Sequence, residues 1–143
     1  KHFPANSSGY FNRLKAVHNV AAVTGACLAV ERSNWVELEG LDEENLAVAY
    51  NDIDLCFKAR AKGLRVVFTP YAKLLHHESL SRGFDEALKE NQRLQKEVSA
   101  MIEKWGEFLT TDPAYSPNLS CDGGGFELNE KPVATLKNLF KTP

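Results

Sequence analysis

Two groups of side chains in the 143-residue sequence have types and spacing that could do chemistry. Asp52 and Asp54 lie two positions apart, and the adjacent pair His76 and His77 comes further along the chain. A positioned carboxylate can take a proton from a hydroxyl group, and an imidazole can carry a proton or bind a metal ion. These groups alone do not make a metal site, and none has the spacing of zinc ligands. The elements around them must therefore decide which of them meet.

The stretch that contains both aspartates has the composition of a helix. Asn51 is a suitable N-cap, basic residues fill the last turn, and Gly63 can end the helix. Helical residues two positions apart point about 200° away from each other. We therefore expect Asp52 at the rim of the core and Asp54 in an exposed ion pair with Lys58. The alternative for Asp52 is a first-turn acid that only complements the helix dipole.

The segments on either side of this helix have the character of strands. Residues 18–30 form an apolar run without alternation, which predicts a strand covered on both faces, and Gly25 within it marks a bulge or a close approach of another group. Residues 64–70 predict a short strand. Residues 71–75 predict a second extended segment, at whose end only one of the two histidines can face Asp52.

Two further helices are expected. Ser33 is a candidate N-cap for a short helix that ends near Gly40. From Phe84 to Phe108, apolar residues recur at spacings of three and four in a charged background, which is typical of a long amphipathic helix. The order strand, helix, strand, helix predicts an α/β architecture.

Three parts of the chain differ in character. Residues 1–83 carry the candidate site, residues 84–111 the long helix, and residues 112–143 a tail whose Pro and Gly residues predict loops. We expect these to be the domain-level divisions of the chain.

Composition excludes several classes of protein. The chain has 17 Lys and Arg against 19 Asp and Glu, a net charge of −2, so it lacks the basic surplus of a nucleic-acid-binding protein. Residues 20–30, the longest nearly unbroken apolar stretch, reach about half of the roughly 20 residues that span a bilayer. Cys27, Cys56 and Cys121 lie far apart without a Cys-x-x-Cys pair, and two of them sit in apolar segments where a buried free thiol is expected, which favours a reducing, cytoplasmic setting.

Five short motifs, taken together, resemble the C-terminal, acceptor-side half of family 2 glycosyltransferases of the GT-A fold. They are residues 23–32, 39–43, 51–56, 63–70 and 76–83. The segment from Asp112 to Leu119 also resembles the stretch found after this domain in members that build bacterial polysaccharides. The resemblance implies part of a GT-A sheet with flanking helices, and then the long amphipathic helix.

The resemblance assigns a role to individual residues. Asp52 falls on the aspartate that acts as the base for the acceptor hydroxyl. Thr24 and Gly25 match a loop near the donor sugar and acceptor, and Asp42 matches the acidic turn on the acceptor side. His76 matches the histidine that helps hold the divalent metal or the donor diphosphate, with His77 less favoured.

Two neighbours of the base are also counted as substrate-binding residues. They are Asn51 and Asp54. Asn51 stands where the family usually has Glu, so the base is kept while a neighbouring charge is lost. That difference affects the acceptor side of the site.

The resemblance further implies a nucleotide-sugar donor, a glycan acceptor and a Mn²⁺ or Mg²⁺ cofactor. It leaves open whether other parts of the protein associate with a membrane. Two alternatives to a transferase are a self-associating module, in which the 84–108 helix pairs with a second copy, and a hydrolase that uses Asp52 with a histidine-held metal.

The donor-binding half of such an enzyme, with its Asp-x-Asp motif, does not precede Lys1 in this sequence. We therefore expect these 143 residues alone to be a fragment without activity. Calorimetric titration with a nucleotide sugar should show no binding, and micromolar affinity would contradict this expectation.

Overall fold

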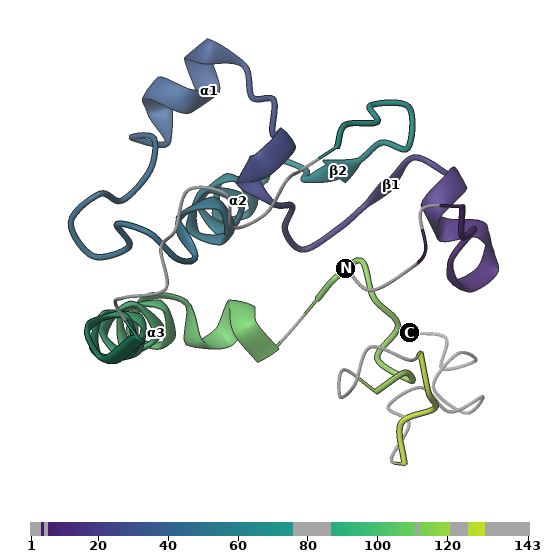
Figure 1. Cartoon of the computed structure of the whole chain (residues 1–143). Coiled ribbons are helices and arrows are strands. Elements are labelled where there is room, and N and C mark those ends of the chain that lie inside the picture. The colour runs from purple at the N-terminus through teal and green to yellow at the C-terminus, as the bar shows by residue number, and fades with distance from the viewer. Residues whose placement is uncertain (1–3, 5, 76–86, 111, 121–125, 131–143) are drawn as a thin grey trace, which may run out of the picture.

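The computed structural model describes residues 4, 6–75, 87–110, 112–120 and 126–130 (Figure 1). The elements, in chain order, are the 3-10 helix η1 (Tyr10–Lys15), strand β1 (His18–Asn19), the 3-10 turn η2 (Gly25–Cys27), helices α1 (Arg32–Glu37) and α2 (Asn51–Ala61), strand β2 (Val67–Phe68) and helix α3 (Ala87–Thr110). Helices and a small sheet together form part of an α/β domain. Helix α2 lies between α3 on one side and the β1 and η2 segment on the other (Figure 1).

The sheet is smaller than the apolar run predicts. Strands β1 and β2 pair in antiparallel orientation, with His18 opposite Phe68 and Asn19 opposite Val67. The prediction of one strand over residues 18–30 is wrong, because the chain turns into η2 at Gly25. The prediction for residues 64–70 is confirmed only at β2, and no strand forms over residues 71–75.

Helix α1 is short, and its capping differs from the prediction. Ser33 lies inside the helix, and the N-cap position is Glu31, whose side chain makes no capping hydrogen bond. At the other end, the amide of Gly40 donates to the carbonyl of Trp35 at 3.0 Å. Glu39 and Gly40 both have a φ of +59°, so the helix ends in left-handed backbone beside Gly40, as expected.

Helix α2 begins and ends in left-handed backbone. The predicted N-cap, Asn51, is instead its first residue, and Tyr50 precedes it with φ 64° and no side-chain cap. An aromatic residue in this conformation costs about 1 to 3 kcal/mol, so the surrounding structure must hold it. At the C-terminus, Gly63 has φ +77°, and the amide of Leu64 donates to Ala59 at 3.0 Å in a Schellman motif, which confirms Gly63 as the stop.

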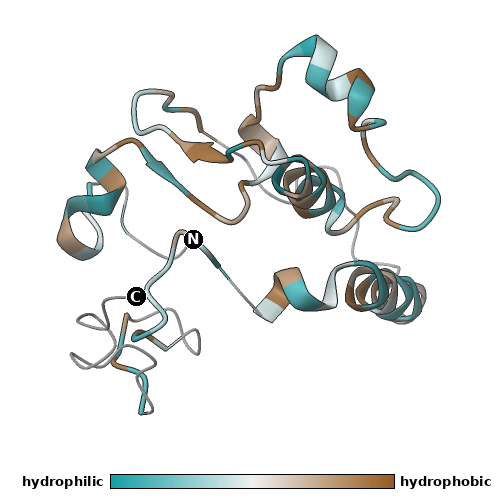
Figure 2. Cartoon of the chain, turned by 180° about the vertical axis from the view of Figure 1, so that it is seen from behind, coloured by the Kyte–Doolittle hydropathy of each residue, from teal (hydrophilic) through white to brown (hydrophobic). Residues whose placement is uncertain are grey.

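The predicted long amphipathic helix is confirmed as α3, and Figure 2 shows hydrophobic residues gathered along one side of it. That side closes the core, in which Met101 packs with Leu46 and Phe57, each less than 5% exposed. Trp105 leaves helical geometry at φ −128°, and Figure 1 shows the last turn of α3 directed away from the rest of the helix. The buried part of this face therefore packs on its own chain, and pairing of the helix with a second copy stays an alternative.

The described part of the tail contacts the beginning of the chain. Leu119 and Leu128 form an isolated antiparallel bridge within an otherwise irregular segment. The ring of Phe126 stacks on Tyr10 of η1, with centroids 4.4 Å apart and planes inclined by 2°. The loop-rich tail is therefore held to η1 by aromatic contact.

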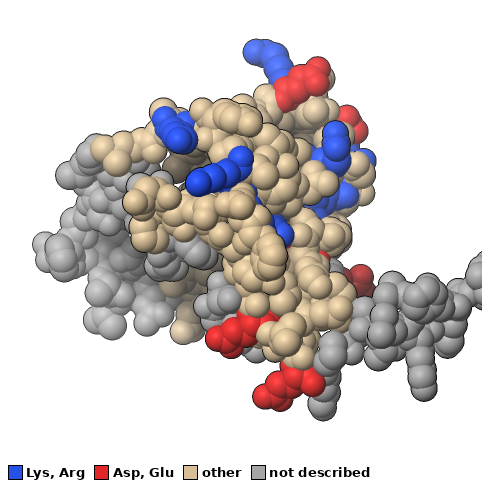
Figure 3. Space-filling model, turned by 90° about the vertical axis from the view of Figure 1, so that its right-hand side faces the viewer, with Lys and Arg blue, Asp and Glu red and all other residues tan. Residues whose placement is uncertain are grey.

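Charged side chains are spread over the described surface. On the face shown in Figure 3, Lys and Arg side chains lie at the upper left and along the right-hand side, and acidic side chains lie near the top and toward the bottom. Ion pairs at Asp42 and Asp54 join separate parts of the chain.

Three glycine substitutions test this backbone. Alanine at Gly63 meets no atom within 4 Å but must adopt φ +77°, and alanine at Gly40 adds a Cβ 2.9 Å from Cζ2 of Trp35. We expect Gly63→Ala to lower the free energy of unfolding by about 1 kcal/mol and Gly40→Ala by about 2 kcal/mol or more. Gly106→Ala, in open space inside α3, should leave it unchanged or raise it by up to about 1 kcal/mol. Urea unfolding monitored by circular dichroism measures all three, and equal losses for Gly40 and Gly63 would contradict the packing at Trp35.

Candidate active site

Asp52 lies in the first turn of α2 and faces η2. Its Oδ2 accepts a hydrogen bond from the backbone amide of Gly25 at 2.7 Å, and its Oδ1 accepts from the amide of Ile53 at 2.8 Å. The residue is half-buried, as expected for a carboxylate at the rim of the core. Both oxygens are thus oriented by backbone amides.

The close approach at η2 depends on Gly25. A Cβ built on Gly25 would lie 3.2 Å from the Cβ of Asp52, so a side chain there would push the amide away from the carboxylate. The neighbouring Thr24 caps η2, since its Oγ1 accepts from the amide of Ala26 at 3.4 Å. The structure therefore brings Thr24, Gly25 and Asp52 together, although Gly25 lies in a 3-10 turn and not in a strand.

Cys56 holds the same segment one helical turn further on. Its Sγ accepts from the amide of Val23 at 3.5 Å, and the thiol is buried, which confirms the prediction for this cysteine. Burial raises the pKa of the Cys56 thiol, the Val23 amide opposes the rise, and the charge of Asp52 adds to it. A protonated, buried thiol packs and does not react. Cys27, by contrast, is exposed, against expectation, and Cys121 lies outside the described residues.

Asp54 faces the opposite side of α2 and is fully buried. Its Oδ1 accepts from the indole Nε1 of Trp105 at 2.7 Å and lies 2.8 Å from Nζ of Lys104, both on α3. The predicted pair with Lys58 is present at 3.1 Å, as an ion pair without hydrogen-bond alignment. The predicted exposure is wrong, because α3 covers this face and leaves Asp54 0% exposed. Asp54 is therefore a structural residue and is not available to a substrate.

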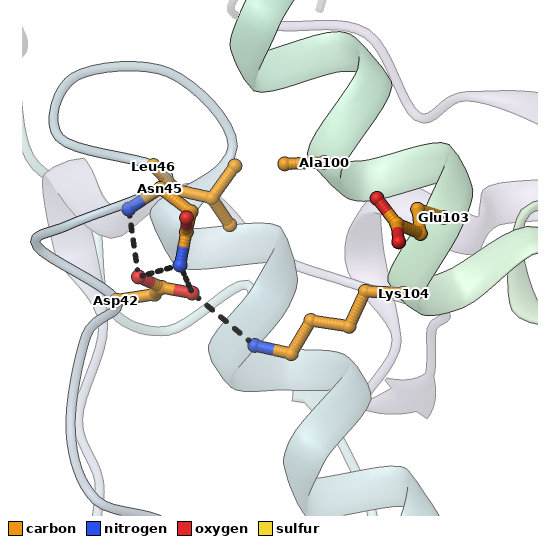
Figure 4. Close-up of a pocket in the computed structure, with 6 residues that line it drawn as sticks. All are labelled: Asp42, Asn45, Leu46, Ala100, Glu103 and Lys104. Carbon is orange, nitrogen blue, oxygen red and sulfur yellow. Dashed lines mark hydrogen bonds and ion pairs between the residues drawn. The ribbon is translucent and has the colours of Figure 1, made fainter.

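Asp42 belongs to the same charge cluster as Asp54. Its Oδ1 accepts from the amide of Asn45 at 2.9 Å, and its Oδ2 lies 3.4 Å from Nζ of Lys104. Figure 4 shows Lys104 reaching from α3 toward Asp42 across a pocket of about 340 Å³. The lining residues are Asp42, Asn45, Leu46, Ala100, Glu103 and Lys104. The structure thus connects Asp42 with Asp54, and not with Asp52.

The pKa values of this cluster shift in the direction of charge pairing. The Asn45 amide is the main cause that lowers the pKa of Asp42; partial burial opposes it, and the Asn45 side chain and Lys104 add to it. Burial works against the charge of Lys104, but the hydrogen bond and charge of Asp54, and then those of Asp42, outweigh it and raise its pKa. Both groups are therefore charged near neutral pH.

Among the remaining predicted residues, Asn51 is the one that the structure describes. Asn51 is half-buried at the start of α2, next to Asp52. His76 and His77 lie outside the described residues, so their predicted metal role has no geometry to support it. Within residues 4, 6–75, 87–110, 112–120 and 126–130, no three His, Cys, Asp or Glu side chains are placed to hold a metal ion together. The described residues alone therefore do not form a metal centre.

Three residues of α3 contact the part of the chain from Asp42 to Asp54, and none of them was predicted as a site residue. They are Glu97, Lys104 and Trp105. Glu97 is 2% exposed, and its two carboxylate oxygens accept from the amides of Val48 and Ala49, each at 3.1 Å. Glu97 stands four positions before the buried Met101 and eight before the partly buried Trp105, so a charged residue in the apolar stripe was the signal in the sequence.

Comparison with known proteins identifies the class to which this chain belongs. A family model described as glycosyltransferase like family 2 matches residues 7–96, more than half of the chain. The chain belongs to this family, which confirms the resemblance and implies a GT-A fold. No solved structure matches the chain significantly.

Several curated relatives are much longer than this chain. It is 44% identical over 127 residues to the uncharacterized protein y4gI of Sinorhizobium fredii, covering 89% of this chain and 14% of that protein. It is 34% identical over 111 residues to the O-antigen biosynthesis protein RfbC of Myxococcus xanthus, covering 77% and 8%. An N-acetylglucosaminyl-diphospho-decaprenol L-rhamnosyltransferase of Mycobacterium tuberculosis is 35% identical over 68 residues, covering 48% and 22%. The chain thus spans less than a quarter of the length of each of these relatives.

Among the residues that the structure describes, no helix has the length and apolar character needed to cross a bilayer.

A titration of Asp42 tests the charge cluster. We expect the Asp42 carboxyl to titrate below its ordinary pKa of 3.8. Its contribution to stability is then fully present above that pH and is lost as the pH falls through the folded pKa. Lys104→Met should move the pKa of Asp42 only part of the way back, because the Asn45 amide is the larger cause. Carbon-detected NMR measures both values, and full recovery to 3.8 in the variant would contradict this order of causes.

Proposed function

We propose that this chain is part of a glycosyltransferase that moves a sugar from a nucleotide-sugar donor to a hydroxyl group of a glycan, with Asp52 as the base. Membership of glycosyltransferase like family 2 supports the reaction class. The observation that carries the assignment of Asp52 is its half-buried carboxylate, held by the amide of Gly25 at 2.7 Å.

The chemistry requires a group of this kind. A sugar hydroxyl is a weak nucleophile, and a carboxylate within hydrogen-bond reach can remove its proton as the new bond forms. The hydroxyl oxygen bonds to the anomeric carbon, the bond from that carbon to the nucleoside diphosphate breaks, and the hydroxyl proton passes to Asp52. The backbone amides of Gly25 and Ile53 hold the carboxylate in one orientation while leaving lone pairs of its oxygens for the acceptor.

The residues around Asp52 support this arrangement to different degrees. Thr24 and Gly25 form the backbone that faces the carboxylate, which supports their predicted place beside the reacting sugars. Asn51 adjoins the base and carries no charge, so it can offer a hydrogen bond to an acceptor but no electrostatic repulsion. The acceptor role of Asp42 stays a prediction, since its contacts join it to Lys104 on the other side of α2.

The wider predictions also stay proposals. A bacterial surface polysaccharide is the class of product that the names of two relatives, the O-antigen biosynthesis protein and the rhamnosyltransferase, support. A Mn²⁺ or Mg²⁺ cofactor would neutralise charge on the departing diphosphate. His76 as a metal or diphosphate ligand, a cytoplasmic location and a homodimer rest on the sequence alone.

The substitution Asp52→Asn tests the base. It keeps the shape of the side chain and an oxygen to accept from Gly25, but it removes the ability to take a proton. In the whole natural protein, we expect transfer of sugar to acceptor to fall at least about 100-fold with an unchanged circular dichroism spectrum. Glu130→Gln, which neutralises an exposed acid in the tail, should leave the rate unchanged.

Two outcomes of this experiment would count against the proposal. Transfer that persists in Asp52→Asn within a few-fold of the natural rate would remove Asp52 as the base. Release of free sugar without transfer to any acceptor hydroxyl would favour the hydrolase alternative.

A further inference from the structure

We propose that Glu97 is a positioning residue that sets the place of Asp52 through the backbone ahead of α2. The proposal rests on the function proposed above, because it assigns Glu97 a role for the base of that reaction. It is carried by a buried carboxylate of α3 that accepts hydrogen bonds from two consecutive backbone amides of another segment.

The segment that Glu97 holds has little structure of its own. Residues 46–50 lie in neither a helix nor a strand, and they end at Tyr50 in left-handed backbone without a side-chain cap. Helix α2, and with it Asp52, starts immediately after this point. Any change in the path of residues 46–50 therefore moves the first turn of α2.

Glu97 supplies partners for the middle of this segment, whose first residue, Leu46, is fixed in the core. It is 2% exposed, and its oxygens lie 3.1 Å from the amides of Val48 and Ala49. Hydrogen bonds to a charged acceptor are about twice as strong as neutral ones, and here one rigid carboxylate takes both. The side chain of Arg93 lies 3.9 Å from Oε1 and keeps a positive charge beside it.

The same face of α3 makes a second attachment two turns further on. Met101 packs against Leu46 in the core, and Lys104 and Trp105 hold Asp54. Asp52 lies between the two attachments, three positions after Ala49 and two before Asp54. It touches η2, so α3 fixes its position without contacting it.

Such positioning has a measurable effect on catalysis. A displacement of about 1 Å in a reacting group can lower a rate by about 100-fold. Glu97→Gln is nearly isosteric, but the side-chain nitrogen of glutamine cannot accept a hydrogen bond, so one of the two backbone amides loses its partner. The matched control is Glu107→Gln, which neutralises an exposed acid further along α3.

The test uses the whole natural protein and two independent measurements. Hydrogen exchange, read by mass spectrometry on the peptide that spans residues 46–50, should become at least about tenfold faster in Glu97→Gln and stay unchanged in Glu107→Gln. In sugar transfer, kcat should fall about 10-fold to 100-fold while the KM for the donor changes less than about twofold. Glu97→Asp, which keeps the charge on a shorter side chain, should fall between the natural protein and Glu97→Gln.

The outcomes separate this role from the proposed function. A natural protein that exchanges slowly at residues 46–50 but transfers no sugar would overturn the proposed function and, with it, this role. Normal transfer with an unchanged kcat in Glu97→Gln would overturn the role of Glu97 alone. Faster exchange throughout α2 and β1, with kcat per folded molecule unchanged, would overturn it too, because Glu97 would then only add to overall stability.

Discussion

The packing of the described chain depends on one buried carboxylate. Asp54 has no exposed surface, and its oxygens face two lysines and an indole from α2 and α3. Removing a carboxylate from water costs several kcal/mol, and charged partners with well-placed hydrogen bonds are needed to offset that cost. Because Lys104 and Trp105 provide these partners, α3 must dock on α2 in one register. In this register, Met101 of α3 packs with Leu46 and Phe57 to form the core.

This constraint gives the two aspartates of α2 separate functions. Asp54 points toward α3, where its carboxylate is buried and paired with Lys104 and Trp105. Asp52 points toward η2, and its carboxylate stays half-buried at the surface. A helix alone fixes the roughly 200° between them. Which of the two is covered depends on where α3 lies, and residues far along the chain decide that.

Local patterns in the sequence predicted local structure well, and long-range contacts poorly. The amphipathic period of α3, the glycine that ends α2 and the opposed directions of Asp52 and Asp54 result from periodicity, backbone freedom and helix geometry. The burial of Asp54 and the carboxylate of Glu97 depend on a docking partner more than forty positions away. The apolar run at residues 18–30 misled because apolar composition indicates burial, whereas the turn at η2 is held by hydrogen bonds to Asp52 and Cys56 on α2.

The surroundings of the Trp105 indole make its fluorescence sensitive to the packing of α3 on α2. Its Nε1 donates to a buried carboxylate, its ring contacts Phe57 and Phe108, and a lysine ammonium lies 5.7 Å from its centre. The other tryptophan, Trp35, sits 38% exposed beside Gly40. Separation of α3 from α2 would therefore expose Trp105 to water and remove the nearby charge pair between Lys104 and Asp54. The surroundings of Trp35 would not change. The protein carries its own optical probe of whether the helix behind the candidate base is docked.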